Sequence, residues 1–390
     1  MSTEITDQVP VTVICGPLGA GKTTLVNRLL AAPGGRQIAV IVNDMGEINV
    51  DAELIETESE DGIVDLSNGC ICCRLQGDLV EQARRLSAAR EFDHLVVEAS
   101  GISEPLPIAR TLTGGAGETD DPPAEYDLDA IVAVIDAYGF WKAFDPDESL
   151  PDAAPDPERP LTDVLVDQIE FCNVLLLNKC DMVPDDALDE IEATIRELQP
   201  EADLHRTVYS ELSPDVVLDT GRFDFETAKR SPGWKQVLAG DGTDTQASGH
   251  VHGAHDHREH GQSDHDHGEA QSAADRHGVE SIVYERHRPF DPEQFDDWLD
   301  DWDGTLIRAK GFVWVSSRPD EVLGVNQAGP SVQAGPIGEW GEKEPATKLV
   351  LIGRELDEQR LGAELDSCLA AEDGEGSMTA ASDPFPRENQ

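Results

Sequence analysis

Basic residues are scarce in this chain of 390 residues, in which 29 lysines and arginines stand against 79 aspartates and glutamates and give a formal net charge of −50. A surface this acidic repels polyanions, so we expect neither nucleic acid nor an anionic membrane as a partner. The sequence also lacks an apolar stretch long enough to span a bilayer. It shows no secretory leader, from which we expect a cytoplasmic protein with reduced thiols.

The acidic residues are spread along the whole sequence and are not gathered in one tail. At low salt such a surface repels itself, whereas molar salt shortens the Debye length to about 3 Å and removes much of that repulsion. The composition therefore predicts a halophilic protein that works in a salt-rich cytoplasm.

A glycine-rich loop, GPLGAGKT at 16–23, follows the apolar run 11–15 and precedes helix-spaced apolar residues at 24–30. It matches G-x-x-x-x-G-K-[ST], in which glycines let backbone N–H groups surround a polyphosphate. Lys22 is expected to reach the β- and γ-phosphates as a catalytic group, and the Thr23 hydroxyl to bind Mg²⁺. The alternative is a chance glycine-rich turn, which the flanking strand and helix disfavour. The expected phosphate-binding residues are Gly16, Gly19, Ala20, Gly21, Lys22, Thr23 and Thr24.

Another apolar strand, at 93–97, ends in Glu98 and is followed closely by Gly101. The Glu98 carboxylate is suited to hold Mg²⁺ through a bound water, and the backbone N–H of Gly101 can approach a γ-phosphate. Strand-end acids are often only solvated, so this assignment depends on the phosphate loop.

The apolar strand at 174–177 ends in Asn178, Lys179, Cys180 and Asp181, an N-K-x-D pattern. The Asp181 carboxylate offers two acceptors to the ring N–H and exocyclic amine of guanine, a pair that adenine does not present. The aliphatic stem of Lys179 can lie over the base. A polar turn that ends a strand is the alternative. After a phosphate loop, the pattern favours GTP over ATP.

Three thiols, Cys70, Cys72 and Cys73, lie within four residues and directly follow a turn at Asn68-Gly69. Thiolates suit Zn²⁺, Cu⁺ or Co²⁺, and a helix suggested by 75–80 would lower their pKa at its N-terminus. Ordinary buried cysteines are the alternative, which fits the remaining four thiols. Those are Cys15, Cys172, Cys180 and Cys368.

Histidines are concentrated at 240–280, a stretch rich in Gly, Asp and Ser that cannot form a core. Imidazoles alternating with carboxylates suit loose capture of Zn²⁺, Co²⁺ or Ni²⁺. A solvated interdomain linker is the alternative, and the two roles are compatible. The candidate metal ligands are His255, His257, His265 and His267.

Strands alternate with helical patterns through the first half of the chain, which predicts an α/β fold with a mostly parallel sheet flanked by helices. We place this GTPase domain at 1–231. A flexible linker at 232–280 leads to a small α+β domain at 281–372, and a disordered tail is expected at 373–390.

Acid- and proline-rich stretches at 114–127 and 145–160 are expected to be surface insertions. Within the second domain we expect strands at 282–284, 311–316 and 348–352, and helices at 295–299 and 361–369. Its aromatic residues are interpreted as core residues. These are Trp298, Trp302, Phe312 and Trp314.

At these motifs the sequence resembles the CobW-type GTPases, relatives of the nickel-insertion GTPases that are often described as metallochaperones. The resemblance covers the phosphate loop, residues 43–51, the thiol motif, EASG at 98–101 and NKCD at 178–181, and it resumes at 286–290 and 306–315. It implies a P-loop GTPase domain followed by the C-terminal domain of that family, with GTP, Mg²⁺ and Zn²⁺ or Co²⁺ bound.

Two motifs depart from the family's pattern. The usual Asn-Glu-Phe-Gly is NDMG at 43–46, which shortens a carboxylate, at Asp44, that the resemblance implicates in switch and metal contacts. The usual Glu-Thr-Ser-Gly is EASG, which removes a hydroxyl at Ala99. The residue that positions the attacking water is open between Asp44, Glu47 and Glu98.

From these features we expect a GTPase that converts GTP to GDP and phosphate and delivers a transition metal, zinc or cobalt, to a client metalloprotein. The phosphate contacts would order the segments at 43–51 and 70–73, and hydrolysis would release them. One alternative is a metal buffer or sensor with negligible turnover. Another is a dedicated assembly factor for cobalamin synthesis or for a metal-dependent hydratase.

Overall fold

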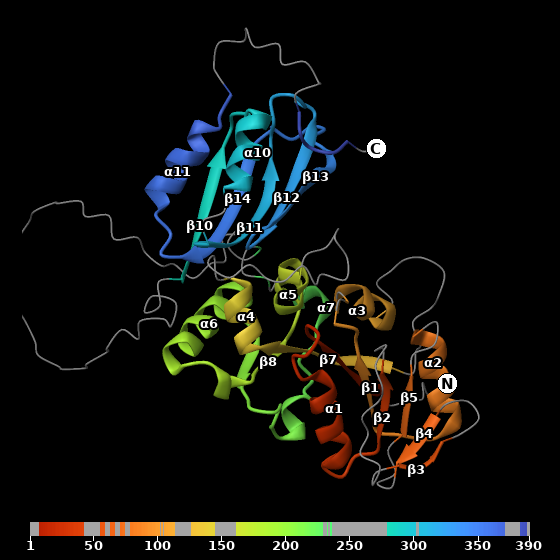
Figure 1. Cartoon of the computed structure of the whole chain (residues 1–390). Helices are drawn as coiled ribbons and strands as arrows, with labels where there is room; N and C mark the ends of the chain where they lie inside the picture. Colours follow the sequence, from red (N-terminus) through yellow and green to blue (C-terminus); the bar gives the residue numbers. More distant parts are fainter. Residues whose placement is uncertain are drawn as a thin grey trace, which may run out of the picture.

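The computed structural model has two domains, each built on its own sheet (Figure 1). It describes residues 8–42, 55–58, 63–66, 71–74, 79–101, 103, 105–113, 126–144, 161–228, 232, 235, 279–301, 304–370 and 383–387.

The N-terminal domain contains a nine-stranded sheet in the order β3-β4-β5-β2-β6-β1-β7-β8-β9. From β5 to β9 in this order every pair is parallel, while β3 and β4 add an antiparallel edge. The strands are β1 (Val9–Cys15), β2 (Ile38–Val42), β3 (Ile55–Glu58), β4 (Ile63–Leu66), β5 (Ile71–Arg74), β6 (His94–Glu98), β7 (Tyr126–Asp136), β8 (Val174–Asn178) and β9 (Asp203–Arg206).

Helices cover both faces of this sheet, which is why its central strands are mostly apolar and do not alternate, although β1 contains the buried Thr12 and β6 the buried His94. Helix α1 packs on one face beside Val217 and Leu218, and helices α2 to α6 pack on the other. The helices are α1 (Lys22–Ala31), α2 (Leu79–Ala89), α3 (Pro105–Thr113), α4 (Ala137–Ala143), α5 (Leu161–Glu170), α6 (Asp185–Leu198) and the short α7 (Phe225–Ala228).

The C-terminal domain is a five-stranded antiparallel sheet in the order β10-β14-β11-β12-β13. Two helices, each begun by an aspartate N-cap at Asp291 or Asp357, pack on one of its faces around Phe290 and Phe295. Its elements are β10 (Val279–Arg286), α10 (Pro292–Asp300), β11 (Leu306–Val313), β12 (Glu321–Ala328), β13 (Ser331–Glu339), β14 (Thr347–Arg354) and α11 (Glu358–Ser367).

The expected fold class is confirmed, and several local expectations need correction. The strand expected at 311–316 begins at Leu306 and ends at Val313. Strands β12 and β13 were not expected from the sequence at all. Residues 126–127 belong to β7 and Tyr126 is buried, so the first expected surface insertion is too long at its end. The rest of that stretch, and 145–160, lie outside the described residues.

The disordered tail expected at 373–390 is wrong for residues 383–387, which pack against the C-terminal domain. Asp383 accepts hydrogen bonds from Arg318 Nε and Nη2 at 2.7 and 3.0 Å, and Phe385 is buried beside Phe295. Residues 383–387 have too little apolar surface for their docking site to be predicted from the sequence.

The aromatic residues expected in the C-terminal core contribute to it unequally. Trp298 is half-buried and stacks on Phe295, and Phe312 and Trp314 are half-buried as well. Trp302 lies outside the part of the chain that the structure describes. The fully buried rings are Phe290 and Phe295.

Candidate functional site

The phosphate loop joins β1 to α1, and its glycines adopt backbone conformations that a side chain would obstruct. Gly16 has φ 143° and Gly21 has φ 112°. A Cβ at Gly16 would lie 2.1 Å from the carbonyl oxygen of Val134, and one at Gly21 would lie 2.4 Å from Nδ2 of Asn178. The loop is therefore shaped by neighbouring strands into the tight curve that a polyphosphate-binding loop needs.

Helix α1 begins at this loop, and no side chain caps its N-terminus, which the helix dipole makes partly positive. Its N-cap is Gly21, which supplies no side-chain hydrogen bond, and no acidic residue lies in its first turn. The backbone N–H groups at the start of a helix attract anions, and a capping carboxylate would compete with a phosphate for them. In a chain with a net charge of −50, a helix start without acidic residues is well suited to a phosphate.

Lys22, the first residue of α1, is buried, and its Nζ donates hydrogen bonds to the carbonyl oxygens of Gly16 and Pro17 at 2.9 and 3.1 Å. The ammonium group thus lies over the phosphate loop. Thr24, in contrast, is exposed in the first turn of the helix. The expected contact of Lys22 with the β- and γ-phosphates stays a prediction.

Thr23, in the first turn of α1, and Glu98, at the end of β6, meet at one point. The Thr23 hydroxyl donates to Glu98 Oε1 at 2.6 Å, and Glu98 is fully buried. The register explains the meeting, because Glu98 pairs with Ile14 at the end of β1 and with Val42 at the end of β2. A hydroxyl and a carboxylate side by side are the hard oxygen ligands that Mg²⁺ takes beside phosphate, so these residues fit that ion.

Gly101 lies against the phosphate loop. A Cβ at this position would approach the backbone nitrogen of Leu18 to 2.8 Å, so only glycine allows this proximity. Because the backbone at Gly101 lies against the phosphate loop, its N–H is near the place where a γ-phosphate is expected.

Asn178 connects three parts of the expected nucleotide site. Its Nδ2 donates to the Ala20 carbonyl oxygen at 2.8 Å, and its Oδ1 accepts from the Ser210 backbone N–H at 2.8 Å and from the Thr207 hydroxyl at 3.1 Å. The Ser210 hydroxyl in turn donates to the carbonyl oxygen of Gly21 at 3.1 Å. The side chain of Asn178 therefore holds the strand end, the phosphate loop and the 207–210 segment together.

Lys179 and Asp181 complete the N-K-x-D pattern that begins at Asn178. Lys179 has φ 60°, and its Nζ makes a 2.6 Å ion pair with Oδ2 of Asp136 at the end of β7. Asp181 is exposed in the 3₁₀ turn Cys180–Met182, where its carboxylate is open to a base. The expected contacts of the Lys179 stem and the Asp181 carboxylate with guanine stay predictions.

Sequence reasoning missed Asp136, Thr207 and Ser210. Asp136 had a weak signal, since it is an acid at the end of an apolar strand, like Glu98. Its Oδ1 accepts from the N–H groups of Tyr138 and Gly139 and so caps α4, while Oδ2 holds Lys179. Ser210 gave no signal, because its φ of 53° follows from the fold.

The thiol motif is described only in its strand. Cys72 and Cys73 belong to β5, where their backbones pair with Val40 and Ile41 of β2. These two cysteines therefore lie within a strand and not in the first turn of a helix, which corrects that expectation. The described part of α2 begins at Leu79, and 75–78 lie outside the described residues. Cys70 lies outside the described residues.

The remaining thiols fit the expectation of ordinary buried cysteines. Cys15, Cys172 and Cys368 are buried, and Cys180 is half-buried. Burial raises the pKa of Cys368 to about 11, although a hydrogen bond involving Ser367 opposes that shift. Thiols held neutral in this way are poor metal ligands at neutral pH.

The candidate ligands from the histidine-rich stretch lie outside the part of the chain that the structure describes. So do Asp44 and Glu47, which stay predictions for the hydrolytic step. Within the described ranges, no group of three or more His, Cys, Asp or Glu side chains is arranged to hold a metal ion. No described helix is long and apolar enough to cross a bilayer. The unplaced ligands are His255, His257, His265 and His267.

A phosphate loop at the end of β1, an acid beside its threonine and an N-K-x-D strand end on one mostly parallel sheet define a P-loop GTPase. Two family profiles match the chain: "CobW/HypB/UreG, nucleotide-binding domain" over residues 10–206, and "Cobalamin synthesis protein cobW C-terminal domain" over residues 279–369. The chain belongs to the CobW family, and the resemblance of its motifs is confirmed.

Curated relatives support this membership along most of the sequence. Zinc-regulated GTPase metalloprotein activator 1 of Dictyostelium discoideum is 36% identical over 354 residues, covering 86% of this chain and 69% of that protein. The zinc chaperone CobW of Pseudomonas aeruginosa is 29% identical, covering 93% and 92%. Among solved structures, Zn(II)-bound YjiA GTPase from Escherichia coli matches 93% of this chain and 100% of that one, at 23% identity and a TM-score of 0.44.

Proposed function

We propose that this chain is a GTP-hydrolysing metallochaperone that binds a transition metal, zinc or alternatively cobalt, and delivers it to a client metalloprotein in a nucleotide-dependent way. The names of the two curated relatives, a zinc chaperone and a zinc-regulated metalloprotein activator, support the metal. We infer the nucleotide dependence from the sheet register between β5, which contains Cys72 and Cys73, and β6, which ends in Glu98.

Strand β2 is the only strand between the two strands concerned. Cys73 pairs with Ile41 of β2, and Ile41 pairs with Val97 of β6. Two strand spacings place the Cys73 backbone about 10 Å from that of Val97, the residue before Glu98. Because the strands are parallel, their carboxyl ends point toward the same edge of the sheet, where the phosphate loop lies.

The metal would be held by Cys70, Cys72 and Cys73, with a carboxylate or water as a further ligand. Thiolates prefer zinc or cobalt over the hard ions that bind beside phosphate, so one chain can hold two kinds of metal without exchange between them. The histidine-rich stretch would collect the ion loosely and raise its local concentration. We propose these ligands on chemical grounds.

In hydrolysis, water attacks the γ-phosphorus of GTP, the bond to the β–γ bridging oxygen breaks, and GDP, phosphate and a proton leave. Lys22 would approach the β- and γ-phosphates, and the loop N–H groups would hold the chain of phosphates in line. Thr23 and Glu98 would hold Mg²⁺, which neutralises charge on the phosphates. We propose that Asp44, Glu47 or Glu98 positions the water.

We further propose that the protein works in the cytoplasm of a halophilic cell. The support is the net charge of −50, spread along the chain. High salt screens the repulsion among these carboxylates, which would otherwise oppose a compact fold.

A transfer assay tests the proposed function. The zinc-loaded protein is mixed with GTP or GDP in molar KCl, and zinc arriving at a competing chelator is followed by absorbance. We expect GTP turnover to accelerate release in the wild type, and Lys22→Ala to remove the acceleration while it leaves the zinc content unchanged. Release that is equal with GTP and GDP would instead indicate a metal buffer, and zinc content that survives loss of all three thiols would refute the proposed site.

A further inference from the structure

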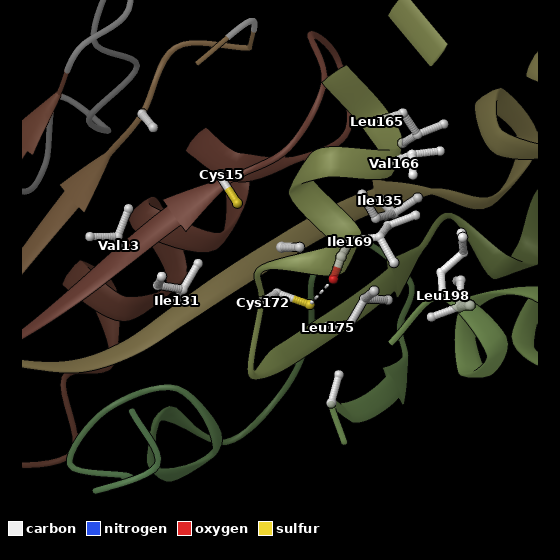
Figure 2. Packing of buried hydrophobic residues seen from close by; sticks show 14 of the residues in the cluster. Val13, Cys15, Ile131, Ile135, Leu165, Val166, Ile169, Cys172, Leu175 and Leu198 are labelled. Atoms are coloured by element: carbon white, nitrogen blue, oxygen red, sulfur yellow. Dashed lines mark hydrogen bonds between the residues drawn. The ribbon is translucent and has the colours of Figure 1, made fainter. Parts of the chain in front are cut away.

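Helix α5 lies at the boundary between the two domains (Figure 1). Its apolar residues Leu165, Val166 and Ile169 pack into the core of the GTPase domain with Ile135 and Leu175, as Figure 2 shows. This packing fixes the position of the helix, so its polar side chains extend from a rigid element to the structures on either side.

One of these side chains reaches toward the nucleotide site. Gln168 is fully buried, and its Nε2 donates hydrogen bonds to the carbonyl oxygens of Ser103 and Gly101 at 3.1 and 3.4 Å. Both carbonyls belong to the segment that follows Glu98. The same segment rests on the phosphate loop, because Gly101 lies against the backbone of Leu18.

Other side chains of α5 reach into the C-terminal domain. Glu170 and Arg308 are both fully buried, and Arg308 Nε and Nη2 donate to the Glu170 carboxylate at 2.8 and 3.0 Å. One turn earlier on the same helix, Asp167 lies 3.6 Å from Arg308. A buried bidentate ion pair has one good geometry and is strongly destabilised by small displacements, so it defines the position of the C-terminal domain on α5.

A second contact lies near the start of the helix. Asp163 Oδ2 accepts a hydrogen bond from the Ser331 hydroxyl at 2.8 Å and from Gln333 Nε2 at 3.0 Å, both from β13. Asp163, Asp167 and Glu170 follow a spacing of four and three residues, which places them on one face of a helix. One face of α5 therefore binds the C-terminal domain, while Gln168 binds the nucleotide-site segment.

We propose that Gln168 is a positioning residue for GTP hydrolysis, through which docking of the C-terminal domain on α5 determines the position of the Gly101 segment. Gln168 acts on the backbone of that segment and not on the nucleotide. The hydrogen bonds hold Gly101 at the distance from the phosphate loop at which its N–H meets the γ-phosphate. The inference rests on GTP hydrolysis and does not depend on which metal the protein carries.

Gln168→Met tests the first half of this proposal, because methionine has a similar length and no hydrogen-bond donor. GTP turnover and urea unfolding are measured on the full chain. We expect kcat to fall roughly tenfold with KM changed by less than about twofold, because misplacing a segment affects the transition state more than ground-state binding. Thr347→Val is the matched control, since Thr347 is also buried and its hydroxyl accepts a hydrogen bond from the backbone N–H of Trp314 at 3.1 Å. Thr347 lies five residues along β14 from Ile352, which pairs with Arg308.

The control separates positioning from general destabilisation. If both variants lose stability alike and only Gln168→Met loses kcat, Gln168 positions the segment. If kcat is unchanged in Gln168→Met, or falls equally in the control, the proposal is wrong. Should Gln168→Met fail to fold, Gln168→Leu removes the same donor with a shorter apolar side chain and answers the same question. Absence of turnover in the wild type would refute hydrolysis itself and not this inference.

A double-mutant cycle tests transmission from the C-terminal domain. Ser331→Ala with Gln333→Ala weakens docking on α5 without touching the nucleotide site. We expect these changes to lower kcat severalfold when Gln168 is present and to have little further effect on kcat in the Gln168→Met background. Equal fold-changes in the two backgrounds would show that docking reaches the site by another route, which contradicts the proposal.

Discussion

At the scale of single residues, Asp136 joins two roles that mutation can separate. Its Oδ1 caps α4, and its Oδ2 holds Lys179 at 2.6 Å. Asparagine caps helices as well as aspartate does, but it carries no charge. We predict that Asp136→Asn weakens GDP and GTP binding roughly threefold to tenfold, because Lys179 loses its fixed orientation, and leaves the unfolding midpoint nearly unchanged.

Asp136→Ala is the companion variant for this measurement by equilibrium nucleotide titration. It removes the cap as well and should lower stability by about 1 kcal/mol in addition to the weakened binding. Unchanged nucleotide affinity in Asp136→Asn would show that the ion pair does not orient Lys179 for the base.

The glycines of the phosphate loop allow a matched pair of substitutions. A Cβ at Gly21 would lie 2.4 Å from Asn178 Nδ2 and 2.9 Å from the Ser210 hydroxyl, whereas one at Gly19 meets nothing within 4 Å. We predict that Gly21→Ala lowers nucleotide affinity at least roughly a hundredfold, since it displaces Asn178 from Ala20. Gly19→Ala, which adds only backbone strain, should cost about 1 kcal/mol of stability. Equal losses of affinity in the two variants would contradict this account.

At the scale of elements, residues 383–387 depend on one carboxylate. Burial alone would raise the pKa of Asp383, but hydrogen bonds from Arg318, Ser317 and the backbone of Phe385 hold it below its usual value. A depressed pKa in the folded state means that docking of the segment is stabilised above the unfolded pKa and is lost as pH falls through the lower folded value. Docking should therefore persist at neutral pH and weaken below about pH 4.

Hydrogen exchange at the Phe385 amide, which donates to Asp383 Oδ1 at 3.0 Å, measures this docking. We predict that Asp383→Asn increases exchange roughly tenfold at neutral pH, because a neutral amide replaces a charge-assisted partner. After correction for intrinsic rates, the wild type should keep its protection down to about pH 4. Loss of protection between pH 5 and 7 would point to a different titrating group.

The elements also show which parts of the fold and of the site can be predicted from the sequence. The phosphate loop, Glu98 and N-K-x-D are local patterns whose chemistry is readable directly, and parallel topology brings their strand ends together. Asp136–Lys179 and Glu170–Arg308 join residues 43 and 138 positions apart, so no local pattern indicates them. Strands β12 and β13 contain glycine or proline within a weak apolar alternation, and their pairing around the turn at Gly329 makes them strands.

At the scale of the whole molecule, the net charge of −50 governs the dependence on salt. We predict that the urea midpoint of unfolding rises as KCl increases from about 0.1 to 2 M, since the Debye length falls from about 10 Å to below 3 Å. A midpoint that keeps rising above about 0.5 M KCl would be a larger effect than the screening of surface charge pairs explains. It would support adaptation to high salt. A midpoint that falls with KCl would contradict the halophilic assignment.

If the nucleotide controls a thiol-based metal site, zinc affinity must depend on which nucleotide is bound, and a zinc titration in two nucleotide states measures that dependence. The titration is made in molar KCl under reducing conditions, with GDP or a non-hydrolysable GTP analogue, on the wild type and on a variant with Cys70→Ser, Cys72→Ser and Cys73→Ser. We predict a thiol-dependent site whose zinc affinity differs at least roughly tenfold between the two states. Equal affinity with both nucleotides would contradict such control, because a ligand that does not discriminate between two states cannot be released by switching between them.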